Sequence, residues 1–189
     1  MSAELVPPAV GLLQEFVNTF EPQTGLESLT TPSALRTWLA GRELVEPGAT
    51  LTEPDLADLL TVREGLRNVL LGHADHEPDP AAIAALSSTL AGYPLRLELG
   101  PAGYRLISAR DDPAGRALGR ILDAVRQSTE DGSWHRLKVC ARDTCRWAFY
   151  DASRNQVRRW CSMAGCGNAM KMRRAYAARK SRAAGNRPE

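Results

Sequence analysis

Four cysteines are the residues of this sequence whose type and spacing could do chemistry together. All of them lie in one 27-residue stretch, in which Cys140 and Cys145 are separated by four residues and Cys161 and Cys166 by the same gap. Zinc takes four soft ligands at the corners of a tetrahedron, each sulfur about 2.3 Å from the metal. Two close pairs joined by a 15-residue loop can supply this set. The spacing therefore predicts one structural zinc ion with no open coordination position.

Other roles for the cysteines are weaker interpretations. Unrelated buried thiols would not gather in two pairs with none elsewhere, and two disulfides would need an oxidising compartment. Residues 1–8 contain neither the basic nor the apolar region of a secretory signal, and no apolar run approaches the roughly 20 residues that span a bilayer. We therefore expect a cytoplasmic protein that has no contact with membranes.

The sequence offers no set of residues for catalysis. It contains neither a Ser/His/Asp set nor a phosphate loop, so we expect that the protein is not an enzyme. His73 and His76 are three residues apart and could share a helix face as metal ligands. Surface histidines at a helix end are the simpler interpretation of this pair.

Charge is distributed very unevenly along the chain. From residue 136 onward there are 14 Lys and Arg residues against three Asp and Glu, whereas residues 1–135 hold 10 basic and 19 acidic residues. A basic segment without compensating acids repels itself, and duplex DNA offers about one phosphate charge per 1.7 Å. We therefore predict nucleic acid, duplex DNA first, as the partner. The predicted contact residues are Arg154, Arg158, Arg159, Lys171, Arg173, Arg174, Lys180 and Arg182.

Three alternatives stay open for this basic segment. RNA carries the same phosphate charge, a zinc module can also serve as an adaptor for an acidic protein, and a basic tail can simply be solvated. A membrane surface is disfavoured because the segment has no broad apolar face.

The part of the chain before the cysteines is predicted to be mostly helical. Proline near the first turn opens each helix, because the missing N–H has no partner there in any case. Thr52 is a plausible N-cap, with Asp55 in the place of a capping-box partner. A less clear helix covers about residues 9–20. The other predicted helix starts are Thr31-Pro32, Asp79-Pro80 and Asp112-Pro113.

One β element interrupts the helices. Leu95, Leu97 and Leu99 alternate with charged residues, which is the period of a half-buried strand, and a Gly/Pro turn leads to a second apolar run at 104–107. The predicted fold class is α+β, with a mostly helical N-terminal domain and a small antiparallel sheet over residues 1–132. A turn at 131–133 separates it from a zinc module over residues 133–189. Alanine and basic residues after Cys166 predict that this module ends in a basic helix that stops at Gly185.

Three polar side chains stand on otherwise apolar helices of the first domain. Asn18, Arg63 and Arg67 could converge on a small anionic ligand. Helix capping by the asparagine and surface salt bridges of the arginines are the alternative interpretation. Ligand sensing and homodimer formation are the two roles that we consider for this domain.

The residues around the cysteines resemble a known family. The segments LKVC (137–140), CRWAFYDASRN (145–155) and RWCSMAGCGN (159–168) are similar to the CGNR zinc finger family. Family members pair this finger with an N-terminal ABATE domain, which the segments FVNT (16–19), VREGLR (62–67) and YPLRL (93–97) resemble. The resemblance covers nearly the whole chain and is most specific in the finger.

The resemblance implies a treble-clef-like finger and a bacterial, stress-associated transcription regulator whose first domain senses a small ligand. In this finger a knuckle would carry Cys140 and Cys145, and a helix start would carry Cys161 and Cys166. One departure from the family pattern matters: Ala169 stands in place of the arginine of Cys-Gly-Asn-Arg. If that arginine contacts phosphate in relatives, Lys171 and Arg173 are close enough to replace it. If it supports packing, the finger of this chain would be looser.

Overall fold

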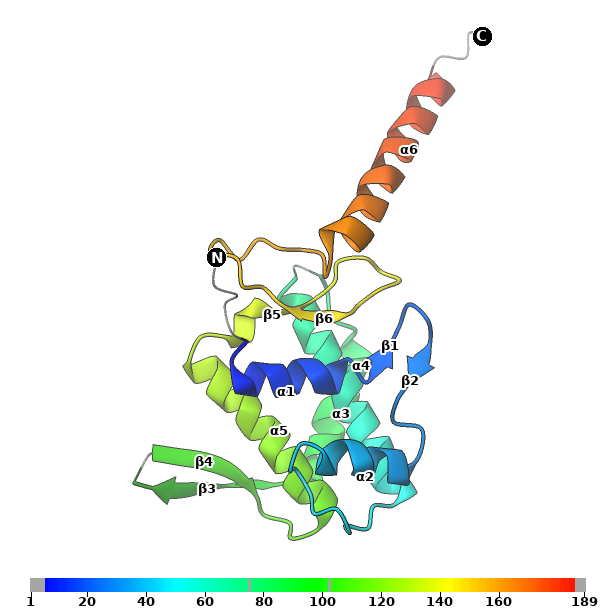
Figure 1. Ribbon diagram of the computed structural model, residues 1–189. Coiled ribbons are helices and arrows are strands. Elements are labelled where there is room, and N and C mark those ends of the chain that lie inside the picture. Colours follow the sequence, from blue (N-terminus) through cyan, green and yellow to red (C-terminus); the bar gives the residue numbers. More distant parts are fainter. Residues whose placement is uncertain (1–5, 75, 102, 186–189) are drawn as a thin grey trace.

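The computed structural model describes residues 6–74, 76–101 and 103–185, without the side chains of residues 174, 178 and 180–185. Helices dominate, and the strands pair into three small antiparallel sheets (Figure 1). The α+β class and the small antiparallel sheet expected from the sequence are thereby confirmed. The elements are α1 (Pro8–Val17), β1 (Phe20–Glu21), β2 (Leu26–Glu27), α2 (Pro32–Ala40), α3 (Glu53–Gly72), α4 (Pro80–Ala91), β3 (Leu95–Gly100), β4 (Gly103–Ser108), α5 (Pro113–Glu130), η1 (Trp134–Arg136), β5 (Leu137–Val139), β6 (Ala148–Tyr150), η2 (Met163–Gly167) and α6 (Asn168–Gly185).

The helices begin where side-chain caps and proline permit. The Thr52 hydroxyl accepts from the N–H of Asp55, and the carboxylate of Asp55 accepts from the N–H of Thr52, which completes the predicted capping box of α3. Thr31, Asp79 and Asp112 cap α2, α4 and α5, with proline in the first turn of each. The predicted helix starts are therefore confirmed, because these local signals satisfy N–H groups that no helix bond can reach.

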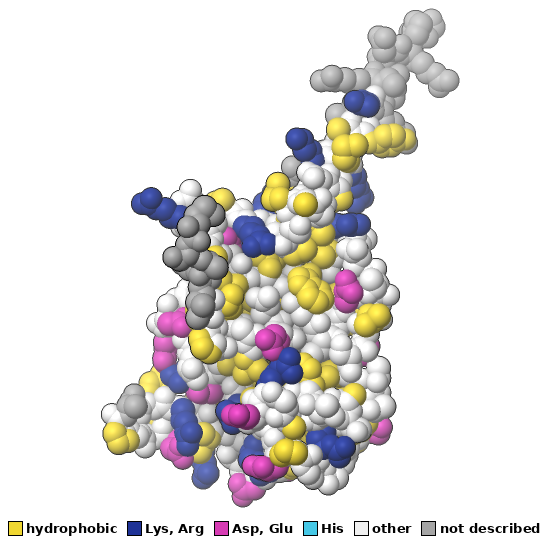
Figure 2. All heavy atoms as spheres, viewed as in Figure 1, with side chains coloured by type: hydrophobic (Ala, Val, Ile, Leu, Met, Phe, Trp, Pro, Cys, Tyr) yellow, Lys and Arg dark blue, Asp and Glu magenta, His cyan; other side chains and the backbone are white. Residues whose placement is uncertain are grey.

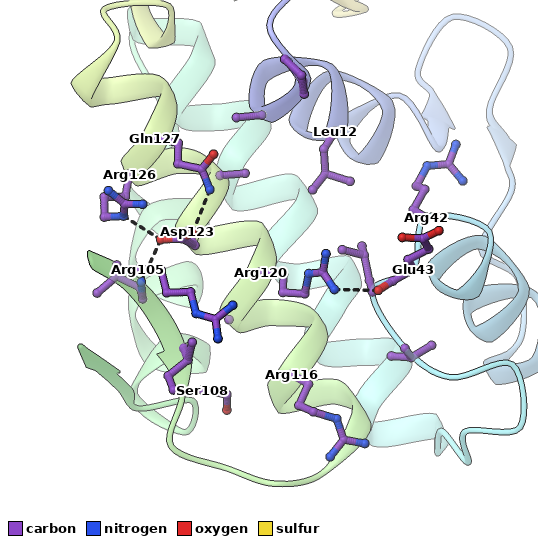
Figure 3. Close-up of a pocket in the computed structure, with 18 of the residues that line it drawn as sticks. Leu12, Arg42, Glu43, Arg105, Ser108, Arg116, Arg120, Asp123, Arg126 and Gln127 are labelled. Carbon is purple, nitrogen blue, oxygen red and sulfur yellow. Dashed lines mark hydrogen bonds and ion pairs between the residues drawn. The ribbon is translucent and has the colours of Figure 1, made fainter. Parts of the chain in front are cut away.

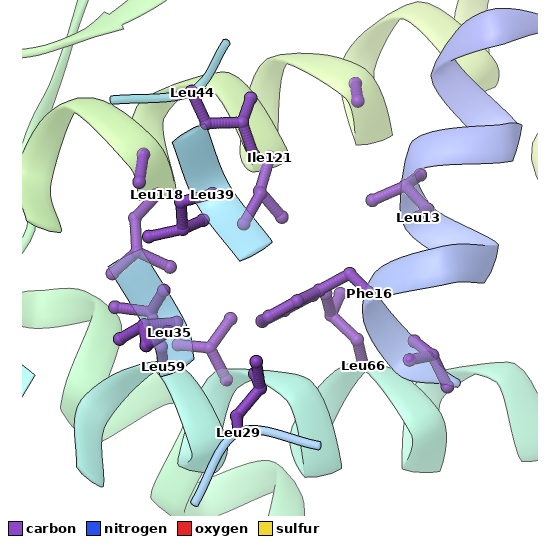
Figure 4. Packing of buried hydrophobic residues seen from close by; sticks show 14 of the residues in the cluster. Leu13, Phe16, Leu29, Leu35, Leu39, Leu44, Leu59, Leu66, Leu118 and Ile121 are labelled. Atoms are coloured by element: carbon purple, nitrogen blue, oxygen red, sulfur yellow. The ribbon is translucent and has the colours of Figure 1, made fainter. Parts of the chain in front are cut away.

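The core forms where α1, α2, α3 and α5 meet. Phe16 of α1 is fully buried and points between the other helices, toward Leu66 of α3 and Ile121 of α5 (Figure 4). Leu35 and Leu39 of α2 close this core. None of the described helices combines the length and the apolar composition that a membrane-spanning segment requires.

The β3–β4 hairpin packs at its base on α5 and extends away from the helices (Figure 1). A Cβ at Gly119 would lie 2.8 Å from the backbone nitrogen of Ser108, so glycine is what permits this close approach. The predicted hairpin is present, but the predicted half-burial of its strand is wrong for Leu97 and Leu99, which are 54% and 78% exposed. The hairpin packs chiefly on α5 near its base, and in the described part of the chain no second layer covers these two leucines.

The β5–β6 hairpin belongs to the same hydrophobic core as the helices. Leu137, Val139 and Ala148 are fully buried, with β5 against α3 and β6 against α1. The strands pair antiparallel, with Leu137 opposite Tyr150. The base of the zinc module thus packs on the first domain. The division at residue 132 stays a prediction from the sequence.

Candidate metal centre and its basic surface

The four cysteines come together at the junction of three segments. Cys140 directly follows β5, Cys145 lies in the turn that leads to β6, and Cys166 lies in η2, at the head of α6. Cys161 lies at the end of the loop that begins after β6. Their Sγ atoms all lie within 4.8 Å of one another, and the Cys145–Cys161 and Cys161–Cys166 separations are both 3.7 Å.

This arrangement fits one tetrahedral zinc ion. Four sulfurs at about 2.3 Å from a central metal lie about 3.8 Å from each other, close to the separations observed. All four residues are free thiols; three are buried, and Cys161 is half-buried. The set of four sulfurs leaves no coordination position for a substrate. The protein therefore carries a site for one zinc ion, and the chemistry of this site is structural.

The environment of Cys145 and Cys161 opposes the ionisation of their thiols in the absence of a metal. Burial, followed by the neighbouring Cys140, raises the pKa of the Cys161 thiol, and burial raises the pKa of Cys145 to about 11. At Cys166 burial acts in the same direction, but hydrogen bonds from the other cysteines and Arg142 lower the pKa of this thiol overall. A bound cation supplies the positive charge that turns buried thiols into thiolates.

Asp151 organises the loop that joins the cysteine pairs. Its fully buried carboxylate receives the N–H of Ser153 (3.1 Å), the N–H of Arg158 (2.9 Å) and the ammonium of Lys138 (3.0 Å). Burial opposes the charge of Asp151, but a hydrogen bond from the Ser153 hydroxyl (2.5 Å), followed by those from Lys138 and the two N–H groups, lowers its pKa below the ordinary value. The buried ion pair thereby ties the loop to β5, two residues before Cys140. Sequence reasoning missed this pair, although Asp151 is the only acidic residue between Asp143 and Glu189.

Two side chains of the first domain fasten the edges of the β5–β6 hairpin. The amide of Asn18, at the end of α1, donates to the carbonyl of Ala148 (2.9 Å) and accepts from its N–H (2.8 Å), as a neighbouring strand would. Nδ1 of His73, at the end of α3, lies 2.8 Å from the carbonyl oxygen of Leu137. The zinc site is thus held by residues that lie far away in the sequence.

Aromatic side chains surround the cysteines. Trp147 and Trp160 pack against the sulfur cluster, and Phe149 is buried beneath the guanidinium of Arg158, 4.7 Å from the ring centre. These rings supply the apolar packing around the metal site. Arg158 also donates to the carbonyl oxygens of Trp160 (2.9 Å) and Cys161, so it braces the loop at the metal site.

The predicted nucleic-acid residues fall on two neighbouring surfaces. Arg154 and Arg159 are exposed on the loop, and Lys171 and Arg173 are exposed on the first two turns of α6. Basic side chains gather around the base of α6, where acidic ones are sparse (Figure 2). Arg179 of α6 is exposed as well, although it was not among the predicted contacts. The side chains of Arg174, Lys180 and Arg182 lie outside the described part of the structure.

The polar residues considered for a ligand pocket have partners within the chain. Arg63 is buried and holds the carboxylate of Glu27 through two nitrogens, both at 2.7 Å. Arg67 donates to the carbonyl oxygens of Val17 and Phe20, the second at 3.0 Å. The Asn18 amide bonds the β6 backbone instead of capping its helix, and both arginines are buried rather than paired at the surface. The three side chains connect α1, β1–β2 and β6 to their neighbours.

Comparison with known protein families finds two overlapping matches. The family model described as "Putative stress-induced transcription regulator" (ABATE) matches residues 11–147, and the CGNR zinc finger model matches residues 136–180. The first match covers most of the chain, includes β5 and ends at residue 147, directly before β6. The second contains all four cysteines. A comparison with curated proteins finds no match.

Proposed function

Because the chain belongs to the ABATE family, whose model is described as "Putative stress-induced transcription regulator", and also matches the CGNR zinc finger, we propose that it is a zinc-dependent regulator that binds duplex DNA. One observation carries this proposal. The loop and the first turns of α6 expose Arg154, Arg159, Lys171, Arg173 and Arg179, and no acidic residue occurs from position 152 to position 185.

Zinc joins the surface of the loop and the surface of α6 into one binding surface. Cys161 ends the arginine-bearing loop and Cys166 lies at the head of α6, so a single ion fixes the loop and the helix relative to each other. Arginines on the loop would contact phosphate, while an isolated helix of this width fits the major groove. Ala169 is exposed at the start of α6. A family arginine in its place would reach the surface, and we propose that Lys171 and Arg173 supply the phosphate contact here.

Binding to a fluorescent DNA duplex tests this proposal across a salt series, with RNA as competitor. We expect a log–log salt slope of about −4 to −6 for the zinc-loaded protein, which corresponds to roughly five or six phosphates. The double variant Lys171→Gln/Arg173→Gln should make the slope shallower by about two. The matched control Arg116→Gln/Arg120→Gln removes two exposed arginines of α5 and should leave the slope unchanged.

Two outcomes would contradict the proposal. Absence of binding even at low salt would assign the basic surface to an acidic protein partner. Preferential competition by RNA would replace duplex DNA with RNA while leaving the role of zinc intact.

A further inference from the structure

An open groove of ≈1060 Å³ lies at the opposite end of the molecule from α6, bordered by α1, α5, the β3–β4 hairpin and the segment after α2 (Figure 3). Arginines line it from several elements. Those labelled in Figure 3 are Arg42, Arg105, Arg116, Arg120 and Arg126.

Two of these arginines have no carboxylate partner in the described part of the chain. Arg116 and Arg120 lie one turn apart on α5, and both are exposed. Arg120 donates to the carbonyl oxygen of Glu43 (2.8 Å) and Arg116 to that of Asp111. A guanidinium has five N–H donors, so most of theirs remain available. Like charges at this spacing repel each other, and a bound anion would remove that repulsion.

Other arginines of the same groove are paired with carboxylates. Arg42 pairs with Glu15 at 2.8 Å, and Arg126 pairs with Asp123 at 2.6 Å. Asp123 also receives the backbone N–H of Leu106 at 2.8 Å, so this pair fixes the hairpin on α5. Among the arginines labelled in Figure 3, this contrast identifies Arg116 and Arg120 as the cations that are free to meet a ligand.

The rest of the lining defines the kind of anion. Apolar side chains contribute part of the surface, among them the buried Leu44 and the half-buried Leu12, so a ligand can place an apolar body beside the arginines. Exposed carboxylates of Glu43, Glu46 and Asp111 also line the groove, and they would repel an extended polyanion. This mixture favours a compact charge on an apolar molecule over nucleic acid.

We propose that this groove binds a small amphipathic organic anion, with its carboxylate or phosphate on Arg116 and Arg120 and its apolar body along α1 and α5. The planar guanidinium fork matches both head groups with paired hydrogen bonds. The site is separate from the zinc module, so it does not depend on the function proposed for that module.

Titration of the zinc-loaded protein with three probes tests this site, namely decanoate, decyl phosphate and the uncharged decyl glucoside. We expect one equivalent of an anionic probe to bind and the glucoside to bind at least tenfold more weakly. Arg116→Gln/Arg120→Gln should weaken the anionic probe by about tenfold or more, because charge-assisted hydrogen bonds are lost. Decanoate and decyl phosphate distinguish a carboxylate ligand from a phosphate ligand.

The matched control is Lys171→Gln/Arg173→Gln, which removes two cations at the other end of the molecule and should bind the probes as the unmodified protein does. Thermal melting of both variants verifies that they are folded. Equal binding of the anionic and uncharged probes, equal weakening by both double variants, or no binding of either anion would each overturn the assignment. DNA binding by the α5 variant reports separately on the zinc module.

Discussion

Within the zinc module, the β5–β6 hairpin is enclosed by the first domain, whereas α6 extends away from it (Figure 1). Leu137 and Val139 of the hairpin are fully buried, and Asn18 and His73 hold its edges. In contrast, Met172 and Tyr176 of α6 are 71% and 72% exposed, and the helix packs chiefly on η2. The zinc site lies between these regions. Packing therefore stabilises one side of the site, and the metal must position the other.

Removal of zinc should increase the difference in order between the β5–β6 hairpin and α6 more than any substitution does. Structural zinc contributes an apparent binding free energy on the order of 10 kcal/mol in small modules. After chelation we expect the loop from residue 151 and the head of α6 to lose protection from hydrogen exchange, while β5, β6 and α3 retain it. Re-addition of zinc is the control. Loss of protection in β5 and β6 as well would mean that packing alone does not hold the hairpin.

Replacement of Asp151 with Asn should have the next largest effect. The substitution leaves the buried Lys138 ammonium without its carboxylate, and the loss of one partner of a buried pair costs about 3–5 kcal/mol. Denaturant unfolding of the zinc-loaded protein measures this cost. The matched control is Asp143→Asn in the same module, since the carboxylate of Asp143 is 70% exposed in its pair with Arg146. Similar costs for both variants would contradict the role given to Asp151.

Asn18→Ala tests the contact between α1 and β6. It removes both hydrogen bonds with Ala148 and leaves backbone groups of β6 unsatisfied, which costs about 1–3 kcal/mol. Thermal or denaturant unfolding checks the value, with the exposed Asn155→Ala as control. A cost no larger than that of the control would mean that the edge of β6 does not need this amide.

The His73 contact should make the junction sensitive to acid. Burial is the main cause that lowers the pKa of His73, with smaller contributions from His135 and Lys138. A base with a lowered pKa contributes its full stability above the ordinary value of about 6.5, and this contribution falls as the pH drops toward the folded pKa. The stability difference between the protein and its His73→Asn variant should therefore shrink as the pH falls below about 6.5. A difference independent of pH would exclude this titration.

The parts of this architecture that could be predicted are local in sequence. The capping box of Thr52 and Asp55 and the four-cysteine spacing depend on neighbouring residues, and both form as expected. The contact of Asn18 with Ala148 joins positions 130 residues apart, and no periodic pattern in the sequence indicates such a contact. The exposure of Leu97 and Leu99 was missed for a related reason: alternation indicates a strand, but only the surrounding fold decides whether its apolar face is covered.

Truncation on α6 should have the smallest effect on stability. Met172→Ala and Tyr176→Ala remove exposed side chains from a helix that packs chiefly on η2, so we expect changes within about 0.5 kcal/mol. Leu137→Ala in the buried hairpin is the contrasting truncation and should cost about 2–5 kcal/mol. Denaturant unfolding compares all three. A cost above about 1 kcal/mol for Tyr176→Ala, outside the range of ordinary surface substitutions, would mean that α6 packs on protein in solution. Its basic face would then be less accessible to a polyanion, and the contrast between hairpin and helix would not hold.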